Sequence, residues 1–278
     1  MSAAATSAGV RFDGRVALVT GASSGLGRAI ALALGAEGAA VGAMGRDAAT
    51  LADTVGAIEA AGGRALALAG DVRSGAAVED AVARVVEAFG GLDAVAHAAG
   101  VNRGGDAQEL SEDEWDELLE TNLKSCFLLA KHAVPAIRAG GRGGAVVNVS
   151  SIFAQAAIPG AGAYAASKAG VEALTKVMAL DHAAEGIRFN VVAPGSMRTP
   201  MVERELARLA PAEAEALLAG VERAYPIGRL VTVEEVAATV LFLLSDAATG
   251  ITGVCVVVDG GRLARVGDPD PTTDEGAP

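Results

Sequence analysis

The chain has 278 residues, of which 51% are apolar and 20% are charged, a balance that fits one large globular domain and argues against disorder. Its formal net charge is −12 and no run of lysine or arginine occurs, which argues against nucleic acids or anionic membranes as partners. The two cysteines, Cys126 and Cys255, lie far apart and outside any Cys-x-x-Cys or Cys/His cluster. We therefore expect no metal site, no disulfide and a reducing, cytoplasmic location.

The sequence also lacks the marks of a membrane protein. Residues 1–14 are small and polar and do not form the basic and apolar regions of a secretory signal. Apolar runs such as Val254–Val258 are much shorter than the ~20 residues that a spanning helix needs. No membrane partner is expected.

Short apolar runs alternate with longer alanine-rich amphipathic stretches, the pattern of βαβ units around a parallel sheet. Strands are predicted at Val16–Thr20, Ala39–Met44, Ala65–Ala69, Ala94–Ala98, Ala145–Val149, Arg188–Val192 and Val254–Val258. Helices are predicted at Leu26–Gly35, Ala48–Ala61, Ala76–Phe89, Glu112–Ile137, Ala163–Glu185 and Val233–Leu244. Ser111, with Glu114 three residues later, predicts a capping box at the start of the fourth helix. The fold class is therefore α/β: a doubly wound, seven-stranded parallel sheet with helices on both faces.

The domain organisation follows from where this alternation stops. We expect one catalytic domain at 12–263, because the alternating pattern fills that range without a second core. Within it, Ser196–Tyr225 is too long for an ordinary connection and is predicted to be a substrate lid. Residues 1–11 are predicted to form a flexible tail, and residues 264–278, rich in Gly, Pro and Asp, a disordered one.

The turn TGASSGLG at 20–27 joins the first predicted strand to the first helix. Gly21 permits a tight turn, Gly25 lets the backbone approach phosphates, and Gly27 permits close helix–strand packing. Free N–H groups at the start of the helix would face the anion. This context predicts a Rossmann-type dinucleotide site. With its Gly-x-x-x-Gly-x-Gly spacing the chain resembles the short-chain dehydrogenase/reductase family, over about residues 14–261.

The end of the second strand bears on the choice between NADP(H) and NAD(H). A carboxylate there would bind the adenosine ribose of NAD, whereas a cation would pair with the 2′-phosphate of NADP. The positions hold Gly45 and Arg46, which resembles the NADP-preferring pattern of the family. NADP(H) is therefore favoured, while NAD(H) stays open. Asp47 could partly neutralise Arg46, and Ser24 stands where many NADP-preferring members have a second base.

Two further segments resemble cofactor-binding parts of the family. The resemblance implies that Asp71 accepts a hydrogen bond from the adenine amino group and that Val72 packs on the ring, although Asp71 could equally be a helix N-cap or a turn residue. After the fourth strand, His97 and Ala98 stand where the family usually has asparagine. Ala99–Gly100 can still place backbone against the cofactor. We expect His97 to be a buried structural residue rather than a catalytic base.

Tyr164 and Lys168 lie four residues apart, on one face of a predicted helix. A phenol titrates near ~10, and a neighbouring ammonium favours the phenolate, so we expect Lys168 to lower the pKa of Tyr164 for acid/base work. Ser151, thirteen positions before Tyr164, matches the family's catalytic serine and would donate to the substrate oxygen; Ser150 is the less favoured candidate. The resemblance makes Asn122 the fourth catalytic residue, holding a water that relays protons to Lys168.

The segment after the sixth strand resembles the family's nicotinamide site. Pro194 and Gly195 would turn the chain beneath the ring, and Met197 and Thr199 would contact its carboxamide. The residues expected to contact the cofactor are Gly21, Ser23, Ser24, Gly25, Leu26, Gly27, Arg46, Asp71, Val72, Ala98, Ala99, Gly100, Tyr164, Lys168, Pro194, Gly195, Met197 and Thr199.

These features predict an NAD(P)-dependent oxidoreductase acting on a carbonyl or secondary alcohol, with an NADP(H)-dependent ketoreductase favoured. The alternatives are an NAD-dependent alcohol dehydrogenase and a non-catalytic dinucleotide sensor on the same fold. The last strand resembles the one through which family members often form tetramers, so a homotetramer or homodimer is expected. The substrate pocket is assigned to Ser151, Phe153, Gln155, Ile158, Tyr164 and Ser196.

Overall fold

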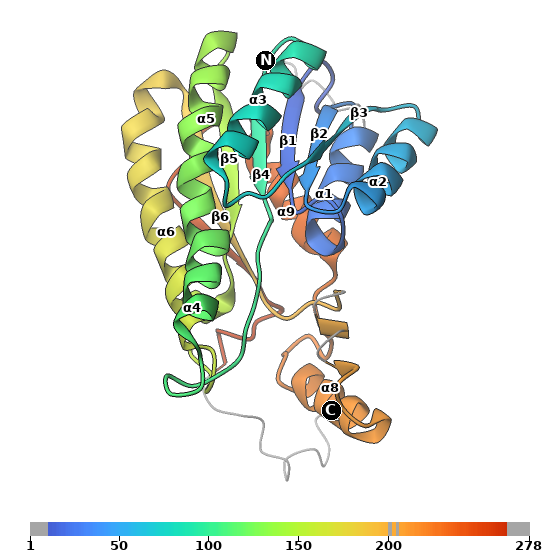
Figure 1. Cartoon of the computed structure of the whole chain (residues 1–278), viewed down its shortest axis with the longest axis vertical. Coiled ribbons are helices and arrows are strands. Elements are labelled where there is room, and N and C mark those ends of the chain that lie inside the picture. The colour runs from blue at the N-terminus through green and yellow to red at the C-terminus, as the bar shows by residue number, and fades with distance from the viewer. Residues whose placement is uncertain (1–10, 200–201, 204–205, 266–278) are drawn as a thin grey trace, which may run out of the picture.

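Seven parallel strands form one sheet in the order β3-β2-β1-β4-β5-β6-β7 (Figure 1). The structure is a computed structural model that describes residues 11–199, 202–203 and 206–265. The strands are β1 Val16–Thr20, β2 Ala40–Gly45, β3 Arg64–Ala69, β4 Ala94–His97, β5 Gly144–Val149, β6 Ile187–Pro194 and β7 Cys255–Val258. The predicted seven-stranded α/β fold is confirmed. The strand ends lie within two residues of the predicted ones.

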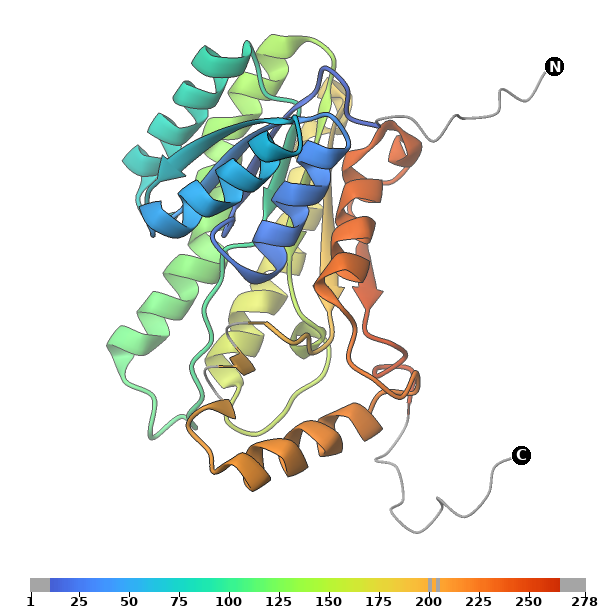
Figure 2. The same cartoon turned by 90° about the vertical axis from the view of Figure 1, so that its right-hand side faces the viewer.

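Helices cover both faces of the sheet (Figures 1 and 2). They are α1 Gly25–Ala36, α2 Ala48–Ala60, α3 Gly75–Phe89, α4 Glu112–Leu119, α5 Ser125–Gly140, α6 Gly162–His182, α8 Pro211–Arg223 and α9 Val233–Leu244. Alternate residues of β1 enter two separate cores: Ala17 and Val19 pack with α1, α2 and α9, whereas Val16 and Leu18 pack with α3, α5 and α6. Both faces of the strand are buried, which explains its continuous apolar run.

The position of the site follows from the strand order. From β1 the chain winds outward through β2 to β3, and it then crosses back to β4 on the other side of β1. The connections after β1 and β4 therefore diverge, and a crevice opens outside the carboxyl ends of these two strands. At this edge α8 lies apart from the sheet (Figure 2).

The fourth predicted helix is not continuous, which corrects the sequence prediction. The capping box of Ser111 and Glu114 is confirmed at its start, but a π-helical turn at Glu120–Lys124 separates α4 from α5. A π-turn holds one extra residue and disturbs the regular carbonyl pairing. The Thr121 carbonyl accepts a bond of 2.6 Å from the Ser125 hydroxyl, which compensates for that disturbance.

The described residues include neither of the predicted tails in full. Residues 1–10 and 266–278 lie outside them, so the predictions of flexible and disordered tails stay predictions. The lid prediction at Ser196–Tyr225 also stays a prediction, although α8 forms within that range. Among the helices in the described part of the chain, none is both long and apolar enough to cross a membrane.

Candidate active site

A cavity of about 510 Å³ opens at the carboxyl edge of the sheet, beyond β1, β4, β5 and β6. Every residue that the sequence predicted as a cofactor contact lines this cavity, as do three of the four predicted catalytic residues, Ser151, Tyr164 and Lys168. The lining also includes Thr50, Gly70, Val101, Thr121 and Val149, which the sequence did not indicate as site residues. Several of them are direct neighbours of predicted site residues in the chain, and this adjacency is the feature of the sequence that could have indicated them.

The glycine turn forms one wall of the cavity and fits a dinucleotide pyrophosphate. A Cβ atom on Gly27 would lie 2.2 Å from the carbonyl oxygen of Gly21, and one on Gly21 would lie 2.9 Å from the backbone of Ala98. Gly21 and Gly25 also have φ values of +67° and +53°. The N-cap of α1, Ser24, makes no side-chain capping bond, and the first turn carries no acidic residue. The free N–H groups and the positive end of the helix dipole therefore suit an anion.

The part of the cavity beyond the end of β2 contains Arg46, where the sequence predicts the adenosine end of the cofactor. Asp47, which could have neutralised Arg46, instead caps α2, because its carboxylate accepts the Thr50 N–H at 2.9 Å. That hydrogen bond also holds the pKa of Asp47 below its usual value. Within the described part of the chain no ion pair joins Arg46 to Asp47. Arg46 is exposed, so its charge is available to a ligand.

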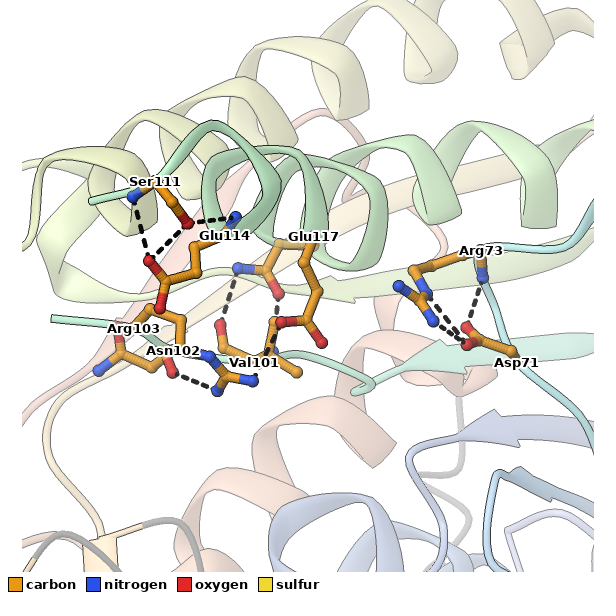
Figure 3. Close-up of polar contacts among 9 residues, drawn as sticks. Asp71, Arg73, Val101, Asn102, Arg103, Ser111, Glu114 and Glu117 are labelled. Carbon is orange, nitrogen blue, oxygen red and sulfur yellow. Dashed lines mark hydrogen bonds and ion pairs between the residues drawn. The ribbon is translucent and has the colours of Figure 1, made fainter.

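Asp71 lies on the same side of the cavity and is held by Arg73 (Figure 3). One carboxylate oxygen accepts the Arg73 N–H at 2.9 Å, and the other accepts two guanidinium bonds of 2.9 and 2.7 Å. These bonds from Arg73, helped by the charge of Arg46, lower the pKa of Asp71. Because Ser74 is the N-cap of α3, Asp71 is a turn residue and not a cap. The adenine contact stays a prediction.

Tyr164 and Lys168 lie one turn apart on α6, and the Lys168 Nζ is 5.7 Å from the centroid of the Tyr164 ring. The ammonium donates to the carbonyl oxygen of Val149, at the end of β5, at 2.9 Å. Burial lowers the pKa of Lys168 to about 8. Burial also raises the pKa of Tyr164, and a hydrogen bond with Ser151 lowers it by less. The prediction that Lys168 lowers the Tyr164 pKa is therefore wrong for the protein without a ligand, because desolvation of the phenolate dominates.

Ser150 and Ser151 follow β5, and their hydroxyls have different partners. The Ser150 Oγ lies 3.1 Å from the carbonyl oxygen of Lys168 and 3.2 Å from the carboxylate of Glu172, so its proton is directed to α6. Ser151 accepts the Phe153 N–H at 3.2 Å and bonds to Tyr164. Its hydroxyl can therefore act on the same atom as the phenol. This geometry favours Ser151 over Ser150, as the sequence does.

Asn122 lies in the π-turn and clamps the segment that follows β4. Its Oδ1 accepts the Val101 N–H at 2.8 Å, and its Nδ2 donates to the Val101 carbonyl at 3.0 Å and to the Ser167 hydroxyl at 3.0 Å. A Cβ atom on Gly100 would lie 3.3 Å from the Asn122 Oδ1 and 3.5 Å from the Lys168 Nζ. Asn122 and Lys168 therefore both lie beside Gly100, although they come from different helices.

His97 is fully enclosed at the end of β4, with 2% of its surface exposed. Its Nδ1 lies 2.6 Å from the Thr20 Oγ1, and its Nε2 lies 2.7 Å from the Ser125 Oγ. Because Ser125 donates its proton to the Thr121 carbonyl, it accepts from the His97 Nε2–H, and Nδ1 accepts from the Thr20 hydroxyl. Burial, with a smaller contribution from the charge of Lys168, lowers the pKa of His97 to about 3. His97 is thus a neutral structural residue, as expected.

Of the residues predicted for the substrate pocket, only Ser151 and Tyr164 line the cavity. The Phe153 ring packs edge-on against Tyr164 at 6.5 Å, and the Ile158 side chain is 47% exposed. The Gln155 amide donates to the Glu172 carboxylate of α6 at 3.2 Å, and its place in the substrate pocket stays a prediction. Ser196 and these three residues lie outside the lining of the cavity. No group of three His, Cys, Asp or Glu residues that could hold a metal occurs among the residues that the structure describes.

A family model described as enoyl-(acyl carrier protein) reductase matches residues 21–262, which is most of the chain and includes both walls of the cavity. The chain belongs to the short-chain dehydrogenase/reductase family. A 3β-hydroxysteroid dehydrogenase of Mediterraneibacter gnavus is 38% identical, over 90% of this chain and 95% of its own. A cyclohexanol dehydrogenase of an Acinetobacter species is also 38% identical, over 92% of this chain and 97% of its own.

The fold agrees with solved members of the short-chain dehydrogenase/reductase family. The crystal structure of levodione reductase superposes with a TM-score of 0.87 and 34% identity, covering 92% of this chain and 100% of that one. The named relatives are dehydrogenases and reductases, so this chain is an oxidoreductase of the family that uses NAD(H) or NADP(H).

The buried neutral His97 predicts a specific pH dependence of stability. Its pKa is about 3 in the folded state and ~6.5 in the unfolded state, so the unfolded state binds more protons as the pH falls. The free energy of unfolding therefore decreases as the pH drops below the pKa that His97 has in the unfolded state. Between pH 7.5 and pH 5, His97 should lower the free energy of unfolding by about 2 kcal/mol.

Urea denaturation at several pH values measures this contribution. In the variant His97→Asn, the free energy of unfolding should fall by about 2 kcal/mol less between pH 7.5 and pH 5 than it does in wild type. The variant His132→Asn, which leaves the buried bonds to Thr20 and Ser125 in place, is the control. Equal slopes in wild type and His97→Asn would contradict a neutral, buried His97.

Proposed function

We propose that the protein is an NADP(H)-dependent ketoreductase that interconverts a carbonyl group and a secondary alcohol on an alicyclic ring. The observation that carries this proposal is the convergence of Ser151, Tyr164 and Lys168 on the cavity wall that faces the glycine turn. The bound nicotinamide would supply or accept a hydride at its C4 atom. Pro194, Gly195, Met197 and Thr199 line the cavity where they would hold that ring.

Tyr164 and Ser151 are proposed to act on the substrate oxygen. In the reductive direction the Tyr164 hydroxyl protonates that oxygen, and the Ser151 hydroxyl donates a hydrogen bond to it as negative charge develops. The raised pKa of Tyr164 favours the protonated phenol, which is the form that reduction requires. Lys168 keeps positive charge beside the phenolate that remains, and Asn122 fixes the backbone around it. A water held by Asn122 would return a proton to Lys168.

NADP(H) is preferred in this proposal because of the groups after β2. Gly45 supplies no carboxylate for a ribose, and the carboxylate of Asp47 is engaged in capping α2. Arg46 supplies a cation to the part of the cavity proposed for the adenosine. An NAD-dependent dehydrogenase working oxidatively is the alternative.

A ring substrate is supported by the relatives and by the apolar groups near Tyr164. Two relatives are named for a 3β-hydroxysteroid and for cyclohexanol, both secondary alcohols on rings. Phe153 packs on Tyr164, and Ile158 exposes an apolar side chain nearby in the chain. The second candidate is an open-chain acyl thioester, which the description of the family model favours. Turnover of cyclohexanone against acetoacetyl thioesters separates the two.

We also propose a cytoplasmic homotetramer. β7 is an edge strand, and three apolar side chains are exposed there: Val257 on β7, Val254 just before it and Phe242 on α9. A second copy would cover these side chains. The cysteines Cys126 and Cys255 are unpaired, which fits a reducing compartment.

Tyr164→Phe tests the chemistry. Removing the phenolic proton donor should lower kcat by about 10²–10⁴-fold while cofactor affinity stays within about threefold. The measurement is cofactor oxidation at 340 nm with cyclohexanone, together with cofactor titration by fluorescence. Turnover near the wild-type level in the variant would exclude Tyr164 as the acid. Cofactor binding by the wild type without turnover of any ketone would instead support a dinucleotide sensor.

Arg46→Ala tests the cofactor choice. Losing a charge-assisted contact to the 2′-phosphate should lower kcat/KM for NADPH by about tenfold or more and leave kcat/KM for NADH nearly unchanged. Arg138→Ala is a matched control, because Arg138 is exposed and pairs with Glu185 away from the cavity. Equal effects of Arg46→Ala on both cofactors would argue against a 2′-phosphate site.

A further inference from the structure

Tyr225, one of the two tyrosines in the chain, lies two residues after α8 and is 3% exposed. Its hydroxyl oxygen accepts the backbone N–H of Ser196 at 2.5 Å. Ser196 lies two residues beyond the end of β6, so this bond joins two points of the chain that are 29 residues apart. The stretch from Ser196 to Tyr225, which includes α8, therefore begins and ends at the same place.

The ring of Tyr225 also packs behind the turn at Gly195. A Cβ atom on Gly195 would lie 2.8 Å from the Tyr225 Cε1 and 2.9 Å from its Oη, so only glycine fits against the phenol. The Gly195 N–H donates to the Val258 carbonyl of β7 at 2.9 Å. Two successive N–H groups of the turn are thus bonded, one to the sheet and one to Tyr225, and together they fix its direction.

The opposite side of this turn lines the cavity. Pro194 and Gly195 face it directly, and Met197, which follows them, forms a β-bridge with Val231. Tyr225 itself does not line the cavity and has no part in the proposed proton transfers. The glycine turn after β1, by contrast, forms another wall of the cavity, and within the described part of the chain no hydrogen bond joins it to Tyr225.

We propose that Tyr225 is a positioning residue that holds the Gly195–Ser196 turn in the shape that receives the nicotinamide end of the cofactor. The inference rests on the proposed use of NAD(P)(H) and adds a residue to it. It predicts that Tyr225 contributes to binding of the nicotinamide half and not to binding of the adenosine half. The effect of a Tyr225 substitution on each half of the cofactor can therefore be measured separately.

The test compares whole cofactor with a fragment that lacks nicotinamide. Affinities of wild type and Tyr225→Phe are measured by isothermal titration for NADPH and for 2′-phospho-ADP-ribose, with NADH and ADP-ribose as the second pair. Losing one neutral hydrogen bond should weaken NADPH binding by about fivefold and leave fragment binding within about twofold. Tyr225→Leu, which also removes the ring behind Gly195, should weaken NADPH binding by about tenfold or more and again spare the fragment.

Thr175→Val is the matched control, because this variant also removes a buried hydroxyl. The Thr175 hydroxyl accepts a hydrogen bond from the Asn148 side chain at 3.0 Å and lies outside the cavity lining. It should leave both affinities unchanged. Equal weakening of NADPH and fragment by Tyr225→Phe, or no weakening of either, would overturn the role of Tyr225. Failure of wild type to bind NADPH and NADH would instead overturn the proposed function, so the two failures are distinct.

Discussion

The buried ammonium of Lys168 is the constraint on which the rest of the site depends. Its side chain is 4% exposed, and burying a cation is costly unless dipoles or charges surround it. The carbonyl of Val149 accepts one of its protons at 2.9 Å, and both the Lys168 Nζ and the Asn122 Oδ1 lie beside Gly100. The end of β5, the start of α6 and the π-turn must therefore meet at one place. Burial lowers the Lys168 pKa to about 8, yet the ammonium still dominates at neutral pH.

Two walls built on different principles face each other across the cavity. The glycine turn offers backbone N–H groups and room, because any Cβ on Gly21 or Gly27 would strike backbone. The catalytic wall offers side chains that are held in place, Tyr164 by the Ser151 hydroxyl and Lys168 by the backbone carbonyl of Val149 at the end of β5. Both walls lie at the carboxyl edge of one parallel sheet, so the strand order brings together residues from distant parts of the chain.

The sequence predicts the sheet and the glycine turn that lines the cavity, because buried strands and glycine turns leave local patterns. It does not predict the π-turn, since one extra residue in a long amphipathic helix leaves no periodic signal, and so Ser125 was not connected to His97. The pKa of Tyr164 was misjudged because charge proximity is visible in sequence and desolvation is not. The bond between Gln155 and Glu172 was not predicted, because sequence alone cannot orient the helix that carries Glu172.

The central claim is that this cavity transfers a hydride from a nicotinamide to a ketone carbon. Deuterium tracing tests it most directly, with NADPH dideuterated at C4 and a panel of ring ketones headed by cyclohexanone. Mass spectrometry of the product alcohol should find one deuterium on the carbinol carbon for every cofactor oxidised. Cofactor oxidation without labelled alcohol, or no oxidation with any ketone of the panel, would contradict the claim.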